Sequence, residues 1–269
     1  MPKKLSPLHL LIILVFISVL ILVLFLPKSK TTEKPILSVS TIDTSISLDV
    51  TTYTQQDKEI EKFIQQFQQN NLSIDSVILL LRQKKQIPLI AYFEELKYLS
   101  SPIDTVWYYL GKNYYNALGF INSPNEADPL IASAARCFQR AITLNEKNTN
   151  AKIMLASCYV QTQNPMLGVQ MLKEIEKTDS TNPLLHLQFA EFSIRSNQLD
   201  KAIQRYKKVL ELDSSKIEVY AFLSEIYMQK KDTLQSIQFL RKFAAKITDT
   251  TLANSINNYI ESLNKTKHH

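Results

Sequence analysis

The residue types that bind metals or act as nucleophiles are scarce in this sequence of 269 residues. Two cysteines and four histidines could contribute to a metal site: Cys137, Cys158, His9, His186, His268 and His269. The cysteines form no CxxC pair, the spacing that many zinc sites and redox-active thiols share. We therefore predict that both cysteines are small apolar side chains buried in a core, rather than a disulfide or a reactive thiol.

Catalytic sequence motifs are absent as well. The sequence has no GxSxG nucleophile motif, no HExxH metal motif and no glycine-rich phosphate loop, and three glycines are too few to build such a loop. Acyl transfer, metal-assisted hydrolysis and phosphoryl transfer are therefore all disfavoured. We predict a protein that is not an enzyme and that has no catalytic residue, metal or cofactor.

The net charge of +6 does not indicate a nucleic-acid binder. Four of the 31 basic residues lie in the first 30 residues, which contain no acidic residue, and the other 27 nearly balance the 25 acidic residues. Such a near-neutral remainder lacks the basic face that phosphate binding requires. Ten prolines and three glycines leave little material for tight turns, so the composition favours an all-α fold.

A long apolar segment near the amino terminus predicts a membrane anchor. Residues 10–26 read LLIILVFISVLILVLFL, with one serine and no charge. With its uncharged flanks, a helix of this length can cross a hydrocarbon layer of about 30 Å. A cleaved signal peptide is the alternative, but the small-x-small site at residues 38–40 lies too far downstream. We predict a tail at residues 1–9 and one uncleaved transmembrane helix at residues 10–27.

The charges that flank the anchor bear on its orientation. Two lysines and the terminal amine precede it and three lysines follow it within residues 28–34, which is close to a tie under the positive-inside rule. A short tail ahead of a large carboxyl-terminal region is the usual layout of a signal anchor. We therefore expect a single-pass protein of a bacterial inner membrane, with the large region outside the cytoplasm, in the periplasm, rather than inside.

Two segments separate the anchor from the strongest patterns in the sequence. Residues 28–55 are dense in serine and threonine and predict an extended linker, although alternation near residues 46–50 leaves a short strand open. Helical periodicity starts at DKEIEKFIQQFQQ, and within residues 56–103 we expect amphipathic helices in antiparallel hairpins.

The stretch WYYLGKNYYNAL, residues 107–118, introduces an internal repeat. The residues that fit W-x2-L-G-x2-Y and then A-x3-F are Trp107, Leu110, Gly111, Tyr114, Ala134 and Phe138. These are the signatures of the two helices of a tetratricopeptide repeat. The chain resembles that family between residues 104 and 250, and the resemblance implies stacked helix–turn–helix units.

Four units fit this repeat. They start at residues 104, 149, 183 and 217, so the last three starts are 34 residues apart, which is the repeat length of the family. The first spacing is 45 residues, so the first unit carries 11 extra residues, near 119–130. This insertion either lengthens the turn between the two helices or lengthens the first helix; insertions in such arrays often carry specificity.

Small residues recur at two positions of every unit, where we expect the two helices to cross. They are Gly111, Ala156, Ala190 and Ser224 in the first helices, and Ala134, Gly168, Ala202 and Ser236 in the second helices. A small side chain at each position lets the two backbones approach closely. His186 takes the place that Trp107 has in the first unit, so we expect it to pack in the core rather than act in catalysis.

Degenerate segments flank the array. Residues 70–103 have Leu89 where a small residue is expected, so we predict an irregular hairpin that caps the first unit. Residues 251–269 predict a carboxyl-terminal capping helix that buries Leu252, Ile256 and Ile260 on one side. The predicted fold is therefore all-α: a transmembrane helix, a linker, an α-solenoid of four units and a capping helix.

The resemblance implies a concave groove lined by positions 2, 5, 9, 12 and 13 of each first helix. These positions hold Tyr108, Lys112, Tyr115 and Asn116; Asn150, Ile153, Ser157 and Gln161; Leu187, Glu191, Ile194 and Arg195; and Glu218, Glu225, Met228 and Gln229. Members that clamp a carboxylate terminus have Lys and Asn where Glu191 and Glu225 stand, so that ligand is disfavoured. We expect a protein segment with apolar side chains and a basic residue, anchored on Tyr108 and Tyr115. A solvated face without a single ligand is the alternative.

The functional prediction is a membrane-anchored scaffold that binds protein partners and no nucleic acid. One alternative is an assembly or maturation factor similar to the tetratricopeptide subunits of cytochrome c biogenesis systems. Another is a structural protein of an envelope complex, whose contacts are made by its convex face and its amino-terminal helices.

Overall fold

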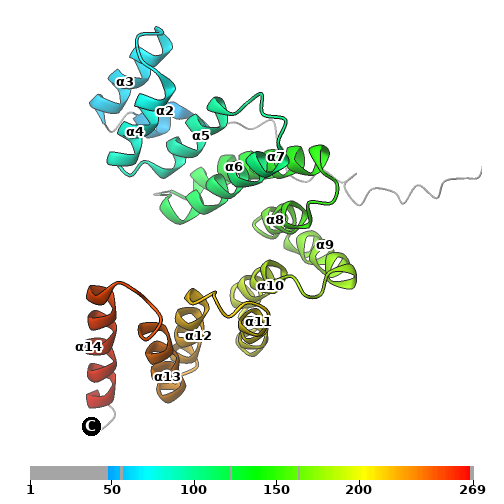
Figure 1. Cartoon of the computed structure of the whole chain (residues 1–269), viewed down its shortest axis with the longest axis vertical. Coiled ribbons are helices and arrows are strands. Elements are labelled where there is room, and N and C mark those ends of the chain that lie inside the picture. Colours follow the sequence, from blue (N-terminus) through cyan, green and yellow to red (C-terminus); the bar gives the residue numbers. More distant parts are fainter. Residues whose placement is uncertain (1–47, 55–56, 122, 163, 267–269) are drawn as a thin grey trace, which may run out of the picture. The chain divides into compact units, whose positions relative to one another are not determined.

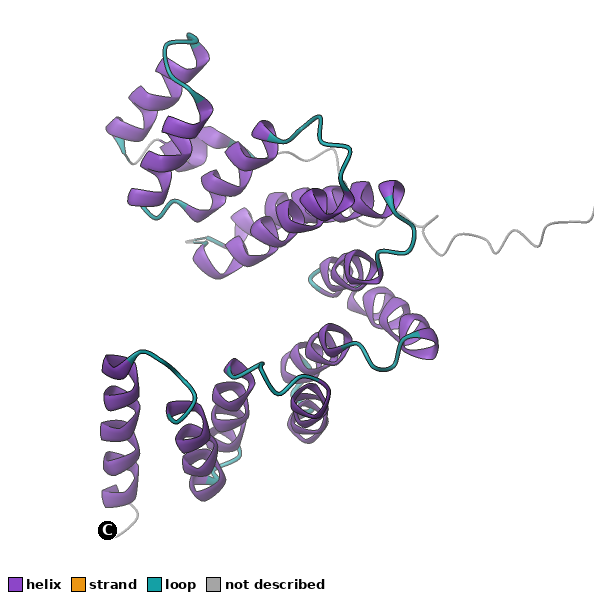
Figure 2. Cartoon of the chain, viewed as in Figure 1, coloured by secondary structure: helices purple, strands orange, loops and turns teal. Residues whose placement is uncertain are grey.

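The computed structural model describes residues 48–54, 57–121, 123–162 and 164–266, and these residues form helices and connecting turns without a strand (Figure 1; Figure 2). The all-α prediction is therefore confirmed for this part of the chain. The predicted tail, anchor and most of the linker lie outside the described residues. Within those residues, no helix is both long and apolar enough to cross a membrane.

The helices follow one another with short connections. In chain order they are α2 (Val50–Thr54), α3 (Lys58–Gln68), α4 (Ile74–Gln83), α5 (Ile87–Lys97), α6 (Asp104–Ala117), α7 (Ala127–Leu144), α8 (Thr149–Val160), α9 (Pro165–Thr178), α10 (Pro183–Arg195), α11 (Leu199–Leu212), α12 (Glu218–Gln229), α13 (Thr233–Ala244) and α14 (Thr250–Thr266). Two 3-10 helices, η2 (Leu118–Phe120) and η3 (Pro124–Glu126), connect α6 to α7.

Four helical hairpins form the array: α6 with α7, α8 with α9, α10 with α11 and α12 with α13. Polar caps and prolines set the starts of several of these helices. The side chains of Asn148, Asn182 and Asp232 accept hydrogen bonds from backbone N–H groups in the first turns of α8, α10 and α13. Pro165 and Pro183 begin α9 and α10, where a missing N–H costs nothing.

Two glycines lie at close approaches between the helices of one unit. A Cβ on Gly111 of α6 would come within 2.6 Å of the Phe138 ring on α7. A Cβ on Gly168 of α9 would come within 2.4 Å of the carbonyl oxygen of Ala156 on α8. In the first unit the small residue therefore makes room for an aromatic ring, whereas in the second it lets two backbones meet.

Four helices end on a residue with a left-handed backbone although none of these residues is glycine. The residues are Asn70, Lys85, Asn197 and Lys231, with φ of 60°, 55°, 56° and 62°. After each one, the next backbone N–H bonds to a carbonyl five residues earlier, as from Asp232 to Tyr227 at 2.8 Å. This is the Schellman pattern, in which glycine is the usual residue.

The amino-terminal helices join the first unit through a buried carboxylate. Glu95 on α5 is 7% exposed and accepts hydrogen bonds from the Tyr114 hydroxyl at 2.5 Å and from Arg136 Nη2, at 2.9 Å to each carboxylate oxygen. Tyr114 belongs to α6 and Arg136 to α7. One side chain of α5 is thus bonded to both helices of the first unit.

The end of the predicted linker differs from the expectation. Residues 50–54 form α2 rather than an extended chain or a strand, and Leu48 just before it is buried in the same hydrophobic core as Ile60 of α3. Asp49 accepts hydrogen bonds from the backbone N–H and hydroxyl of Thr51, which suits the start of a helix. Thr51, one of the residues that indicated a linker, thus donates the hydrogen bonds at the start of this helix, and Asp49 accepts them.

The insertion in the first unit lengthens the second helix rather than the first. The small residue of that helix, Ala134, lies seven residues after the start of α7, whereas Gly168 lies three residues after the start of α9. The extra residues therefore form η2, η3 and about one additional turn of α7.

The last helix, α14, packs on α13 with a narrower face than predicted. Ile260 is 4% exposed and Ile256 is half-buried, but Leu252 is 44% exposed. The prediction that Leu252 is buried is wrong, because the buried apolar side chain of α14, Ile260, lies in a later turn.

Candidate functional site

The first helices of three successive units lie side by side, since α8 contacts both α6 and α10. Equivalent residues of these helices therefore fall in a row. Next to them, η2 and the extra turn of α7 form the edge of the same surface. A groove of about 540 Å³ lies where these elements meet.

This groove, which we call the α6–α10 groove, has a mixed lining. Its residues are Tyr115, Asn116, Leu118, Gly119, Ile121, Ala127, Asp128, Ile131, Gln161, Glu191 and Arg195. A small recess of about 10 Å³ is lined by Tyr115, Ser157, Val160, Gln161, Gln188, Glu191, Phe192 and Arg195. The two sets share four residues, so the recess adjoins the groove, and we call it the floor of the groove.

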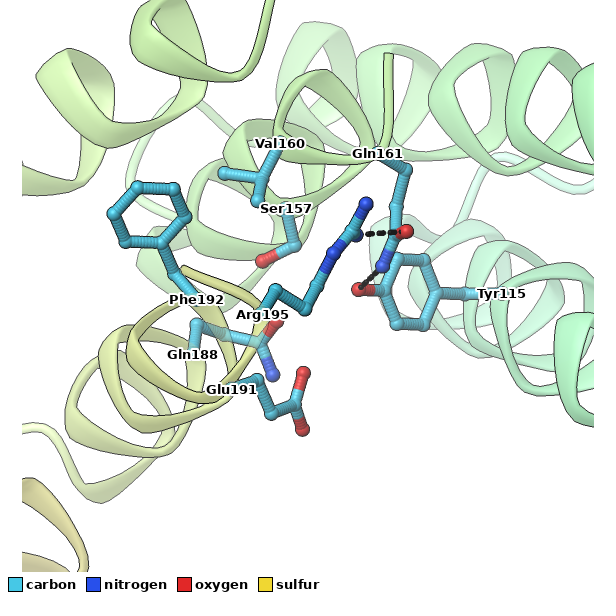
Figure 3. Close-up of a pocket in the computed structure, with 8 residues that line it drawn as sticks. All are labelled: Tyr115, Ser157, Val160, Gln161, Gln188, Glu191, Phe192 and Arg195. Atoms are coloured by element: carbon cyan, nitrogen blue, oxygen red, sulfur yellow. Dashed lines mark hydrogen bonds between the residues drawn. The ribbon is translucent and has the colours of Figure 1, made fainter. Parts of the chain in front are cut away.

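A chain of hydrogen bonds crosses the floor from one unit to the next (Figure 3). Gln161 Nε2 donates to the Tyr115 hydroxyl at 3.0 Å, and Gln161 Oε1 accepts from Arg195. Tyr115, Gln161 and Arg195 come from the first, second and third units. The chain of bonds fixes the direction of all three side chains, so the floor is organised without a ligand.

Glu191 is the one acidic side chain shared by the groove and its floor. Burial raises the pKa of Glu191 to about 7, although a hydrogen bond from Gln188 and the positive charge of Arg195 act in the opposite direction. Figure 3 shows its carboxylate extending away from Arg195, whose guanidinium turns towards Gln161. The described part of the chain contains no ion pair of Glu191.

The charge of this carboxylate affects the pKa values of two nearby tyrosine hydroxyls. Burial raises the pKa of Tyr115, and the charge of Glu191 raises it further. The pKa of Tyr206 on α11 is raised by burial, by Glu191 and by Glu225 of α12. Both tyrosines therefore stay neutral hydrogen-bonding groups.

The structure brings together five of the residues that the sequence projected onto a concave face. Tyr115, Asn116, Gln161, Glu191 and Arg195 all line the groove. They come from late positions of three first helices, so the site lies towards the carboxyl-terminal ends of α6, α8 and α10.

Two projected residues are buried, so their predicted place on the exposed concave face is wrong. Ile153 is completely buried among apolar residues of α9 and α10, and Ser157 is 2% exposed, with its hydroxyl donating to the Ile153 carbonyl at 2.9 Å. The reason is that α9 and α10 both pack against α8 at these positions. Ile153 is unavailable to a partner, and Ser157 contributes only to the recess.

The remaining projected residues do not line the groove. Tyr108 packs edge-on against Tyr109 at 5.4 Å between ring centroids, and Lys112 Nζ lies 5.8 Å from the Tyr108 ring centroid. The others outside the groove lining are Asn150, Leu187, Ile194, Glu218, Glu225, Met228 and Gln229. The predicted anchor Tyr108 is therefore separate from the predicted anchor Tyr115.

Sequence reasoning missed Gln188 and most of the groove wall. Gln188 occupies a position of α10 that the projection does not select, yet it lines the recess beside Glu191. Leu118, Gly119, Ile121, Ala127 and Asp128 belong to the insertion or lie at its edges. The length difference between units identifies the insertion, but only the structure shows that it forms one wall of the groove.

Both cysteines and His186, the one histidine among the described residues, lie in structural positions. Cys137 and Cys158 are buried free thiols, and burial raises the pKa of both. His186 Nε2 bonds to the Ser180 carbonyl at 2.8 Å, just as Trp107 Nε1 bonds to a carbonyl six residues earlier. The predicted packing role of His186 is confirmed. Within the described ranges, no three His, Cys, Asp or Glu residues are placed to hold a metal.

Comparison with known proteins reveals likeness at the level of the fold. A family model described as ChAPs (Chs5p-Arf1p-binding proteins) matches residues 125–244, which is less than half of the chain. Among solved structures, TTC0263, a thermophilic TPR protein of Thermus thermophilus, is similar with a TM-score of 0.50 and 17% identity, covering 70% of this chain and 95% of that one. Yeast Tom70 is similar with a TM-score of 0.46 and 13% identity, covering 72% of this chain and 47% of that one. No curated protein sequence matches significantly.

Proposed function

Because the chain has the fold of tetratricopeptide-repeat proteins, we propose that it is a non-catalytic scaffold that binds an extended segment of a partner protein in the α6–α10 groove. The proposal includes the apolar segment at residues 10–27 as a membrane anchor, with the repeat region outside the cytoplasm. A fold alone does not specify a function, so the proposal rests on the groove.

The observation that supports binding is the groove built from three successive units. Its wall is apolar along Leu118, Ile121 and Ile131, and its floor has oriented polar groups at Tyr115 and Gln161. Apolar walls with a few fixed polar groups are typical of binding sites. A volume of about 540 Å³ suits a few side chains of an extended segment rather than a folded domain.

The match to a protein-binding family agrees with this role. The matched ChAPs model is named for proteins that bind Chs5p and Arf1p, and the match spans residues 125–244, which include α7 to α13. We extend only the general property, binding of other proteins, to this chain.

A membrane anchor would act through local concentration. Tethering the groove to a membrane raises its effective concentration towards partners in or at the same membrane, without any new contact. A moderate affinity in the groove is then sufficient for recruitment.

Site-specific photocrosslinking in cells that express the full chain tests the proposal. A photoreactive residue replaces Asn116 in the groove or, as a matched control, the exposed Gln170 on α9. We expect crosslinks from position 116 to fall within one short segment of one partner, as mapped by mass spectrometry, and no such product from position 170. Crosslinks from position 170 alone would overturn the groove as the binding site.

A fusion test addresses the anchor and its orientation separately. A reporter that is active only outside the cytoplasm is attached after His269, and the chain is extracted from membranes with alkali or with detergent. We expect reporter activity and release by detergent alone. Release by alkali would exclude an integral anchor, and an inactive reporter would exclude the expected orientation.

A further inference from the structure

The charged side chains that line the α6–α10 groove differ in whether they have a hydrogen-bond or ion-pair partner. They are Asp128 from α7, and Glu191 and Arg195 from α10. Arg195 is bonded to Gln161, and its guanidinium turns away from Glu191 (Figure 3). Glu191 has no ion pair among the described residues, and Asp128 is exposed at the edge. The groove therefore presents two carboxylates and one cation, and that cation is hydrogen-bonded to the neutral amide of Gln161.

Glu191 is partly buried and has Arg195 near it but no ion pair in the described part of the chain, and a carboxylate in such a place is costly to ionise because the protein solvates its charge poorly. The charge can be neutralised either by a proton or by a positively charged group from outside. Glu191 lines both the recess and the groove, so such a group can reach it from the groove.

We propose that the α6–α10 groove receives a lysine or arginine side chain of the bound segment, with Glu191 as its carboxylate partner. This inference rests on the proposed function and specifies the partner chemistry of the same site.

The walls suit the rest of such a side chain. Leu118, Ile121 and Ile131 line the groove together with Tyr115 and Glu191. Lysine and arginine have long aliphatic stems that pack along apolar surfaces while the charged end meets an oxygen. An acidic side chain would place its charge against Glu191 and would be repelled.

Proton release provides a signature of this contact. With a pKa of about 7, Glu191 is about half protonated at neutral pH, and an incoming cation favours the ionised form. Other titratable or charged groups around it are Tyr115 on α6, Asp128 on α7, Arg195 on α10, Tyr206 on α11 and Glu225 on α12. The two tyrosines have raised pKa values and do not titrate near pH 7, so Glu191 is expected to dominate proton release there.

Three pools of acetylated and amidated nonapeptides serve as probes for the detergent-solubilised full chain. The central residue is fixed as arginine, norleucine or glutamate, and the other positions vary among uncharged residues. For the unaltered protein we expect the arginine pool to bind about tenfold more tightly than the norleucine pool, as for a charge-assisted hydrogen bond. The ratio falls to about one in Glu191→Gln and is unchanged in the matched control Glu174→Gln, an exposed acid on α9.

The outcomes separate this inference from the proposed function. Equal binding of the arginine and norleucine pools overturns the basic-residue inference and leaves segment binding intact. Preference for the glutamate pool overturns it in favour of anion binding by Arg195. Failure of every pool to bind overturns both.

Calorimetry with the tightest-binding single peptide of the arginine pool supplies an independent measurement. Titrations at pH 7 in phosphate and in Tris buffers, which differ in ionisation enthalpy, should reveal release of about half a proton from the unaltered protein. Glu191→Gln should release none. Identical heats in the two buffers for the unaltered protein would overturn the pairing of Glu191 with the bound cation.

Discussion

The hydroxyl oxygens of Ser224 and Ser236 lie 2.8 Å apart in the interior, where α12 crosses α13. Both side chains are buried, at 3% and 0% exposure. They occupy the positions that hold glycine or alanine in the other three units. In the fourth unit, the crossing thus combines small size with a hydrogen bond between the two helices.

Replacing one of these serines by alanine should destabilise the fourth unit, because the remaining hydroxyl is left buried without its partner. We expect Ser224→Ala or Ser236→Ala to lower the free energy of unfolding by about 1–3 kcal/mol. The double variant should cost less than the sum, since both polar groups are then gone. Urea denaturation of all four forms measures the difference, and additive effects would argue against the bond.

The repeated spacing of small and large residues was sufficient to predict the helical hairpins, because that spacing dictates how two helices pack. The burial of Ile153 could not be predicted from this spacing. It depends on how far α10, from the next unit, covers α8, which is a relation between units. One sequence feature did hint at this burial: residues 153–160, IMLASCYV, lack the polar face that an exposed helix has.

The groove was predictable only in part for a related reason. The repeat register placed Tyr115 and Glu191 on one surface, since equivalent positions of stacked units align. It could not place the insertion, whose path has no counterpart in the other units. The burial of Leu252 was overestimated because the pattern on a capping helix does not reveal which turns its neighbour reaches.

Alanine substitutions of the glycines should rank by what a new Cβ would meet. Gly168→Ala places a Cβ within 2.4 Å of backbone, and Gly111→Ala places one within 2.6 Å of a ring. We expect losses of about 1–3 kcal/mol for Gly111→Ala, despite the better helix propensity of alanine, and a larger loss for Gly168→Ala. Gly119→Ala is the control, because nothing lies within 4 Å of its new Cβ. Thermal melting tests the order, and a neutral Gly168→Ala would contradict it.

Removing the cation that pairs with Glu95 should loosen the amino-terminal helices. We expect Arg136→Met to cost about 2 kcal/mol, between the values typical of exposed and of buried ion pairs, since Glu95 is buried and Arg136 is partly exposed. Hydrogen exchange should accelerate most in α5. The double variant with Glu95→Gln should recover part of the loss, and no recovery would show that packing rather than charge accounts for it.

The raised pKa of Glu191 predicts a specific dependence of stability on pH. Because the folded protein binds the proton more tightly than the unfolded chain, the contribution of Glu191 to stability falls as pH rises from about 4.5 through about 7. Glu191→Gln should therefore melt a few degrees higher than the unaltered protein at pH 8 and at nearly the same temperature at pH 5. A difference that does not change between these pH values would contradict this.

Glycine should stabilise the helix ends that now place lysine in a left-handed backbone. We expect Lys85→Gly and Lys231→Gly each to raise the free energy of unfolding by about 0.5–1 kcal/mol, because they relieve the close approach of Cβ to the backbone. Lys207→Gly within α11 is the control and should lower stability by about 1 kcal/mol. Equal losses at all three positions in urea denaturation would refute the prediction.

The attachment of Glu95 to Tyr114 and Arg136 also bears on how a fragment of this protein is best prepared. A fragment that begins at the first unit, at residue 104, would leave Arg136 without its carboxylate and would uncover the α6 surface on which α5 packs. A fragment that begins ahead of α2, near residue 48, keeps these contacts and the buried Leu48, and still includes every residue of the groove. The natural cutting point for expression thus lies well before the first repeat that the sequence reveals.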